Sequence, residues 1–158
     1  MTMNAHIDCR IATLQDAEIV TEFSSLCALE SENLELDADR VRAGVEAALR
    51  DPAVGRYYLA EIRRKAAGQI MVTREWSDWR NAWIWWIQSV YVSRDTRRLG
   101  VFSALLEHVR EQAIQEGAAL LRLYVDEDNN PAESTYLARG FTRAHYRMLE
   151  RTLATGES

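Results

Sequence analysis

The stretch that decides the fold is Val92-Ser-Arg-Asp-Thr-Arg97-Arg-Leu-Gly100-Val-Phe-Ser-Ala-Leu-Leu106. It begins at the end of Trp83–Val92, an apolar and aromatic segment that predicts a strand. Apolar residues at helical spacing then predict an amphipathic helix from Val101 to Gly117. A second apolar segment, Leu120–Val125, predicts another strand. The order strand, helix, strand predicts a right-handed crossover that leaves the two strands parallel.

The start of this helix forms a candidate anion site, because it directly follows the end of the first strand. The first N–H groups of a helix have no partner within it, and the helix dipole is positive at that end. Arg97 and Arg98 stand beside this point in the sequence. Phosphate groups are the anions that such a helix terminus commonly binds.

The other segments complete an α/β (α+β) chain with antiparallel strands first and the crossover unit later. Further strands are predicted at Ile7–Ala12, Tyr57–Ile62, Gly68–Glu75 and Phe141–Leu149. Helices are predicted from Thr13 to about Leu29, from Asp37 to Asp51-Pro52, and from Asn129-Asn-Pro131 to Gly140. Alternation along Trp83–Val92 predicts that one face carries Trp83, Trp85, Ile87, Ser89 and Tyr91.

The composition is typical of one soluble globular domain, which we expect to span residues 1–158 with an ordered core of about 6–152. The chain carries 19 Lys and Arg against 24 Asp and Glu, and this net charge of −5 argues against a nucleic-acid partner. Its longest uncharged stretch, Asn81–Ser93, is too short and too polar to span a membrane. Met1–Asp8 lacks the features of a signal peptide, so we expect a cytoplasmic protein.

The two cysteines, Cys9 and Cys27, form no CxxC pair and have no histidine at metal-ligand spacing. We interpret them as reduced and mostly buried thiols. No metal site is expected from the sequence.

Two motifs resemble those of the GNAT (GCN5-related) N-acetyltransferase superfamily. Arg97, Gly100 and Phe102 occupy the three positions of the family's Arg/Gln-x-x-Gly-x-Gly/Ala signature. The first two match, and Phe102 departs from the usual small residue. The downstream residues Asn129, Ala132, Tyr136, Gly140 and Phe141 resemble the family's Asn…Ala…Tyr…Gly-Phe segment at its usual spacing. The element order agrees over nearly the whole chain.

This resemblance implies a GNAT fold, with a mixed, mostly antiparallel sheet of six to seven strands, about four helices and two splayed central parallel strands. Acetyl-CoA would bind in the gap between those strands, with its pantetheine arm paired to backbone groups of Val90 and Val92. Asn129 would hydrogen-bond the arm, and Tyr136 stands where the family places its general acid. The implied cofactor-binding residues are Val90, Tyr91, Val92, Arg97, Arg98, Leu99, Gly100, Val101, Phe102, Ser103 and Asn129.

The function that the resemblance implies is direct transfer of an acetyl group from acetyl-CoA to a primary amine of a small molecule or peptide. Protein or peptide N-terminal acetylation and a non-catalytic acyl-CoA-binding module are the open alternatives. The acidic balance favours a cationic acceptor. Candidate acceptor residues are Glu30, Glu32, Glu75, Trp76 and Trp79, for which a solvated surface, core packing or a homodimer contact is the competing interpretation.

Overall fold

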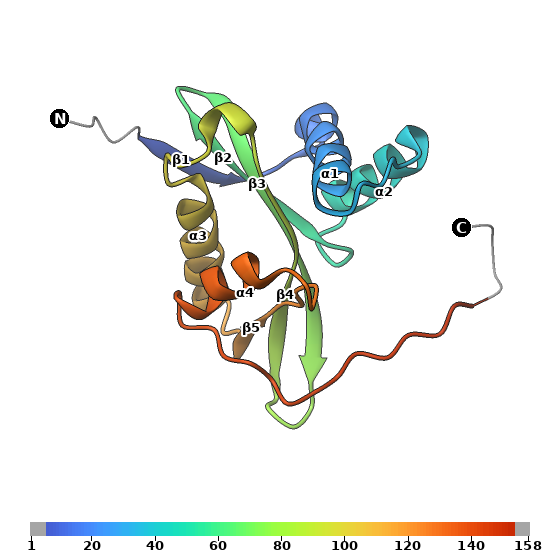
Figure 1. Cartoon of the computed structure of the whole chain (residues 1–158), viewed down its shortest axis with the longest axis vertical. Coiled ribbons are helices and arrows are strands. Elements are labelled where there is room, and N and C mark those ends of the chain that lie inside the picture. The colour runs from blue at the N-terminus through green and yellow to red at the C-terminus, as the bar shows by residue number, and fades with distance from the viewer. Residues whose placement is uncertain (1–5, 154–158) are drawn as a thin grey trace. The chain divides into compact units, whose positions relative to one another are not determined.

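The computed structural model describes residues 6–153, which divide into two compact units. The first unit ends at Tyr124 and holds the sheet with three α-helices, and the second begins at Val125 and holds one α-helix (Figure 1). The single domain expected over residues 1–158 stays a prediction. Most of the N-terminal stretch from which the absence of a leader was expected lies outside the described residues.

The sheet of the first unit has the order β1-β2-β3-β4-β5. Its strands are β1 (Ile7–Ile11), β2 (Arg56–Ile62), β3 (Lys65–Ser77), β4 (Ala82–Val92) and β5 (Leu120–Arg122). The first four strands pair antiparallel with their neighbours, whereas β4 and β5 pair in parallel. The crossover predicted between these last two strands is therefore confirmed, and so is the α/β class.

The helices of the first unit are α1 (Ala17–Glu32), α2 (Ala38–Arg50) and α3 (Val101–Gln115). Figure 1 shows α1 and α2 on one side of the sheet and α3 on the other. Thr13 caps a short 3₁₀ turn that leads into α1, and the Asp37 side chain caps α2 by accepting the Arg40 N–H at 2.8 Å. These are the start signals predicted from the sequence.

Each face of the sheet buries alternate residues beneath its helices. Tyr57 and Leu59 of β2 pack against Val20 of α1 and Val45 of α2. The opposite face carries Gly68 of β3, over which α3 lies closely. A Cβ atom at Gly68 would lie only 2.9 Å from the side chain of Val101.

A β-bulge in β4 changes which residues share a face. Val72 of β3 pairs with Ile87, and Met71 pairs with Ser89, so Gln88 is the extra residue. Met71 packs with the α1 and α2 core, and Val72, one residue further along the strand, faces the α3 side. The predicted common face of Trp83, Trp85, Ile87, Ser89 and Tyr91 is therefore wrong, because the first three lie on the α3 side and the last two on the α1 side.

The strand count differs from the six to seven that were expected. Five strands are described, and Phe141–Leu149 forms no strand within residues 6–153. The predicted strand Leu120–Val125 ends at Arg122. Apolar patterning alone predicted these strands, whereas a strand exists only where a neighbouring strand accepts its backbone hydrogen bonds.

The second unit contains α4 (Asn130–Leu137), which begins after Asn129 and is followed by Gly140 at a φ of +89°. The start and the end of this helix agree with the prediction. Arg143 donates to the Glu133 carboxylate at 2.7 and 3.0 Å, and joins the segment after the helix to its first turn. None of the described helices of the chain has the length and apolar character that crossing a membrane requires.

Candidate active site

The last residues of β4 present an open backbone edge. β4 and β5 pair only over Ile84–Trp86, so on that side residues 87–92 have no strand partner among the described residues. On the other side, the Ser93 N–H donates to the Ala67 carbonyl at 2.9 Å. Because the direction of backbone groups alternates along an antiparallel strand, Val92 and Val90 turn their N–H and C=O groups toward the open edge. These two residues are the ones expected to pair with a pantetheine arm.

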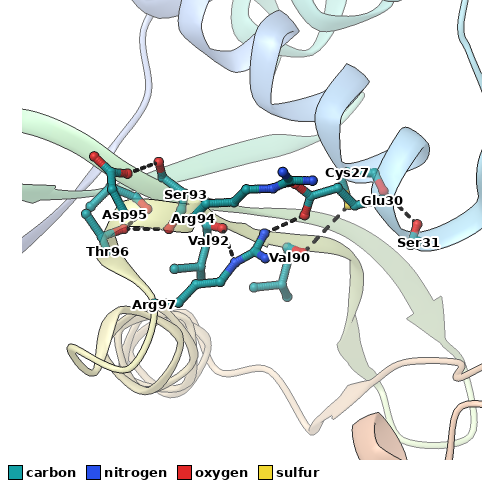
Figure 2. Close-up of polar contacts among 11 residues, drawn as sticks. Cys27, Glu30, Ser31, Val90, Val92, Ser93, Arg94, Asp95, Thr96 and Arg97 are labelled. Atoms are coloured by element: carbon teal, nitrogen blue, oxygen red, sulfur yellow. Dashed lines mark hydrogen bonds and ion pairs between the residues drawn. The ribbon is translucent and has the colours of Figure 1, made fainter.

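Two side chains donate hydrogen bonds to the carbonyl groups of this open edge. The Cys27 thiol of α1 lies 3.7 Å from the Val90 carbonyl oxygen, and the Arg97 Nε donates to the Val92 carbonyl oxygen at 3.1 Å (Figure 2). Burial is the largest cause that raises the pKa of the Cys27 thiol, so this thiol is protonated and acts as a donor. Both contacts therefore compete with a ligand that pairs with this edge.

The loop between β4 and α3 is fixed at its start by backbone and hydroxyl contacts. The Thr96 hydroxyl donates to the Ala67 carbonyl at 2.9 Å, which ties the loop to β3. Further on, Arg98 and Gly100 take left-handed φ angles of 66° and 91°. Only glycine adopts such an angle without steric cost, which explains why the motif needs Gly100.

The amino terminus of α3 follows this loop directly. Its first helical hydrogen bond runs from the Ala104 N–H to the Gly100 carbonyl at 3.0 Å. The N–H groups of the first helical turn point out of this end of α3. A negatively charged group is favoured here by these donors and by the helix dipole.

Glu30, near the end of α1, connects that helix to the same loop. Its carboxylate accepts from Arg94 Nε at 2.7 Å and from the Arg97 guanidinium (Figure 2). The Arg97 hydrogen bond is the largest cause that lowers the pKa of Glu30, and the Arg94 hydrogen bond adds to it. Glu30 is thus an ionised carboxylate that lies against two arginines of the loop.

The Tyr91 side chain lies on the α1 face of the sheet and supports α1. Its ring lies 5.1 Å from that of Phe23, and burial raises the pKa of its hydroxyl. Gln69, its register partner on β3, donates to the Ser24 hydroxyl of α1 at 3.1 Å. These contacts hold α1 against the part of β4 that carries the open edge.

The remaining acceptor candidates do not gather at the open edge. Glu32 is exposed near the end of α1, and Glu75 on β3 accepts from Arg122 at 3.0 Å. Trp76 contacts Trp83 edge to face, with ring centroids 5.1 Å apart, and Trp79 is 89% exposed.

Glu75 pairs in register with Ile84, six residues before Val90 along β4. At roughly 3.3 Å per residue, this is about 20 Å from Val90. The structure therefore brings Glu30 to the loop and leaves Glu75, Trp76 and Trp79 near the β3–β4 turn.

Asn129 and Tyr136 belong to the second unit. The Asn129 side-chain oxygen accepts the Ala132 N–H at 3.2 Å and so caps α4. The Tyr136 ring lies 5.4 Å from that of Phe141, edge to face. α4 and its N-cap thus carry the two residues of the downstream motif for which the resemblance implies a role.

Two residues beside the open edge, Cys27 and Arg94, were missed by the sequence reasoning as members of the site. Arg94 stands three residues before the arginine of the motif, and this proximity is a usable signal. Cys27 gives no such signal, because only the packing of α1 on β4 brings it to Val90. Among the described residues, no three His, Cys, Asp or Glu side chains gather in a way that could hold a metal ion.

Comparison with known proteins agrees with this geometry. The model of the acetyltransferase (GNAT) family matches residues 18–141. An aminoalkylphosphonate N-acetyltransferase of Salmonella typhimurium (strain LT2) is 32% identical over 138 residues, which cover 87% of this chain and 86% of that protein.

Two solved structures extend the comparison. A possible acetyltransferase from Clostridium difficile 630 superposes with a TM-score of 0.90 at 37% identity, over 94% of this chain and 99% of that one. The aminoglycoside N-acetyltransferase AAC(6')-Iy, solved in complex with CoA, shares the fold with a TM-score of 0.78 at 15% identity, over 96% and 98% of the two chains. The chain belongs to the acetyltransferase (GNAT) family.

Proposed function

We propose that this protein transfers the acetyl group of acetyl-CoA directly to a primary amine of a small molecule. The observation that carries the proposal is the open edge of β4 at Val90 and Val92, which leads straight to the α3 amino terminus. This arrangement offers an extended amide-bearing arm the backbone partners of an added strand. It also offers the phosphates at the end of that arm the amides of Val101–Ser103.

The residues present fit such a donor. Arg97 and Arg98 add positive charge beside the helix terminus, and Gly100 keeps the loop free of a side chain where it turns into the helix. Phe102 departs from the family's small residue, but its backbone N–H remains. The proposed contacts therefore use mainly backbone groups, with the arginines supplying charge.

The proposed chemistry needs no covalent bond to the protein. The amine nitrogen, once it has lost its proton, attacks the thioester carbonyl carbon, so that an N–C bond forms and the C–S bond breaks. The Tyr136 hydroxyl gives its proton to the departing sulfur, and the proton that the nitrogen loses as the amide forms restores the hydroxyl through solvent. A backbone N–H stabilises the charge that develops on the carbonyl oxygen. Val92 supports this role better than Tyr91, because the Tyr91 backbone groups face β3.

The acceptor is proposed to be a small amine, since a relative that matches most of this chain is named for N-acetylation of aminoalkylphosphonates. The net charge of −5 favours a cationic amine on long-range electrostatic grounds. Glu30 suits the binding of an ammonium group better than proton abstraction, because its lowered pKa makes it a weak base. Aminoalkylphosphonates, polyamines, aminoglycosides and short peptides are the acceptors to compare.

The test is release of free thiol from acetyl-CoA in the presence of each amine, with wild type, Tyr136→Phe and Tyr146→Phe. Tyr146 is 67% exposed in the second unit and serves as the matched control. We expect amine-dependent release that falls at least about tenfold in Tyr136→Phe and is unchanged in the control. Release that is equal in both variants would remove the acid role. Coenzyme binding without release from any amine would favour the non-catalytic module.

A further inference from the structure

We propose that Glu30 is a positioning residue that competes with the phosphates of coenzyme A for Arg97, and so holds the site in a closed state until the coenzyme binds. This inference rests on the proposed function. It concerns how the same site admits its donor.

The structure shows Arg97 in a position that conflicts with donor binding. Its Nε donates to the Val92 carbonyl, one of the two groups that the arm would use, while its terminal nitrogen donates to Glu30. The carbon of the same guanidinium lies 5.9 Å from the centroid of the Tyr91 ring. Three neighbours therefore hold Arg97 on the open edge, and only Glu30 among them carries a negative charge.

Glu30 uses both of its carboxylate oxygens in this arrangement. Oε1 accepts from Arg94 and Oε2 accepts from Arg97, so one side chain of α1 contacts two residues of the loop between β4 and α3 (Figure 2). The Glu30 side chain keeps only 20% of its exposure, whereas those of Arg94 and Arg97 keep 76% and 45%. The arginines cover the carboxylate and are themselves accessible to an anion from solvent.

Cys27 completes the closed state from the same helix. Its thiol lies on the Val90 carbonyl, one turn of α1 before Glu30. Cys27 thus contacts the Val90 carbonyl, and Arg97 contacts the Val92 carbonyl. Glu30 keeps Arg97 in that position through its own hydrogen bond. A phosphate that draws Arg97 away frees the Val92 carbonyl for the arm, and it also removes one of the two partners of Glu30.

The charge of Glu30 determines whether its removal strengthens or weakens the binding of coenzyme A. In the bound state a pyrophosphate beside the loop stands near the Glu30 carboxylate, and like charges repel. Removing the carboxylate removes both this repulsion and the competing partner of Arg97. Exposed ion pairs contribute little each, so replacing Glu30 by glutamine should lower the Kd for coenzyme A about two- to fivefold.

Glu46 provides a closely matched control. It also accepts from two arginines, Arg42 at 3.0 Å and Arg50 at 2.9 Å, but it does so on the surface of α2. Glu46→Gln changes the net charge by the same amount as Glu30→Gln and leaves the loop untouched. Any difference between the two variants therefore reports the local contact rather than the overall charge.

The experiment is calorimetric titration with coenzyme A of wild type, Glu30→Gln, Glu46→Gln, Arg97→Gln and the Glu30→Gln/Arg97→Gln double variant. Among the single variants we expect tighter binding only in Glu30→Gln. Once Arg97 is absent, we expect the Glu30 substitution to have a smaller effect, because only the repulsion between Glu30 and the phosphates then remains. Steady-state assays should show a correspondingly lower KM for acetyl-CoA in Glu30→Gln.

The opposite results are equally clear. Weaker or unchanged binding in Glu30→Gln, or an equal gain in Glu46→Gln, would overturn the competition. A lower kcat with an unchanged Kd would assign Glu30 to the acceptor amine alone and overturn the competition. Failure of the wild type to bind coenzyme A would overturn the proposed function itself, and with it this inference.

Discussion

Gly68 and Gly44 offer a paired test of how closely α3 lies on the sheet. Gly68 is on β3 beneath α3, and a Cβ atom there would stand 2.7 Å from the Tyr91 carbonyl oxygen, 2.9 Å from Val101 and 3.4 Å from Leu105. Gly44 lies within α2, and a Cβ atom there would meet nothing within 4 Å. Neither glycine has a left-handed φ angle, so neither Gly→Ala change introduces backbone strain.

The two substitutions should shift the free energy of unfolding in opposite directions. Overpacking of this kind costs about 1–3 kcal/mol, and at Gly68 the nearest atom is a backbone oxygen that cannot rotate away. Alanine in place of a helical glycine stabilises by roughly 0.5–1 kcal/mol. Gly68→Ala should therefore unfold earlier than wild type, and Gly44→Ala later. A chain of this size shifts its Tm by about 2–4 °C for each kcal/mol.

The assay is thermal and urea unfolding followed by tryptophan fluorescence and circular dichroism, together with coenzyme A titration of each folded variant. Because Tyr91 lies between Val90 and Val92, the displaced carbonyl in Gly68→Ala should also weaken coenzyme binding. If Gly68→Ala is as stable as Gly44→Ala, then α3 does not approach β3 as closely as the structure shows, and the account of this packing is refuted.

Two further substitutions test the loop and the charge network at β1. Gly100→Ala should lower the free energy of unfolding by about 1–2 kcal/mol, because the φ of +91° is strained for alanine. Titration of this variant should also show weaker binding of coenzyme A. An unchanged free energy of unfolding would contradict the left-handed turn at Gly100. Arg10 donates to both oxygens of Asp16 at 2.8 and 2.9 Å, and this hydrogen bonding lowers the pKa of Asp16 below its ordinary 3.8. Because the folded pKa is the lower one, this stabilisation is present above about pH 4 and is lost as the pH falls through the folded value. Arg10→Gln should thus be less stable than wild type by about 1 kcal/mol or less at neutral pH, and urea unfolding at a series of pH values should show the difference shrinking in acid.

The parts of the fold that could be predicted from sequence depend on local signals. The helix after Gly100 was predicted correctly, because its apolar spacing and its glycines lie within one segment. The parallel pairing of β4 and β5 followed from the handedness of crossovers.

The bulge at Gln88 could not be predicted, because it depends on how β4 aligns with β3 rather than on β4 alone. Since one extra residue moves every later side chain to the other face, the predicted faces failed from Ser89 onward. The strand expected at Phe141–Leu149 failed for a related reason, because an apolar segment does not specify its own partner.

The same division between local and long-range signals explains what could be predicted about the site. The proposed donor contacts use the backbone of Val90, Val92 and the first turn of α3, so a short motif that fixes strand, loop and helix start is enough to indicate them. Phe102 shows this tolerance, because a departure in the side chain leaves the N–H in place. The closed state depends instead on α1 reaching the loop through Glu30 and the open edge through Cys27, more than 60 residues before their partners. Sequence patterns do not reveal which side chains meet over such separations, and for these contacts the structure is needed.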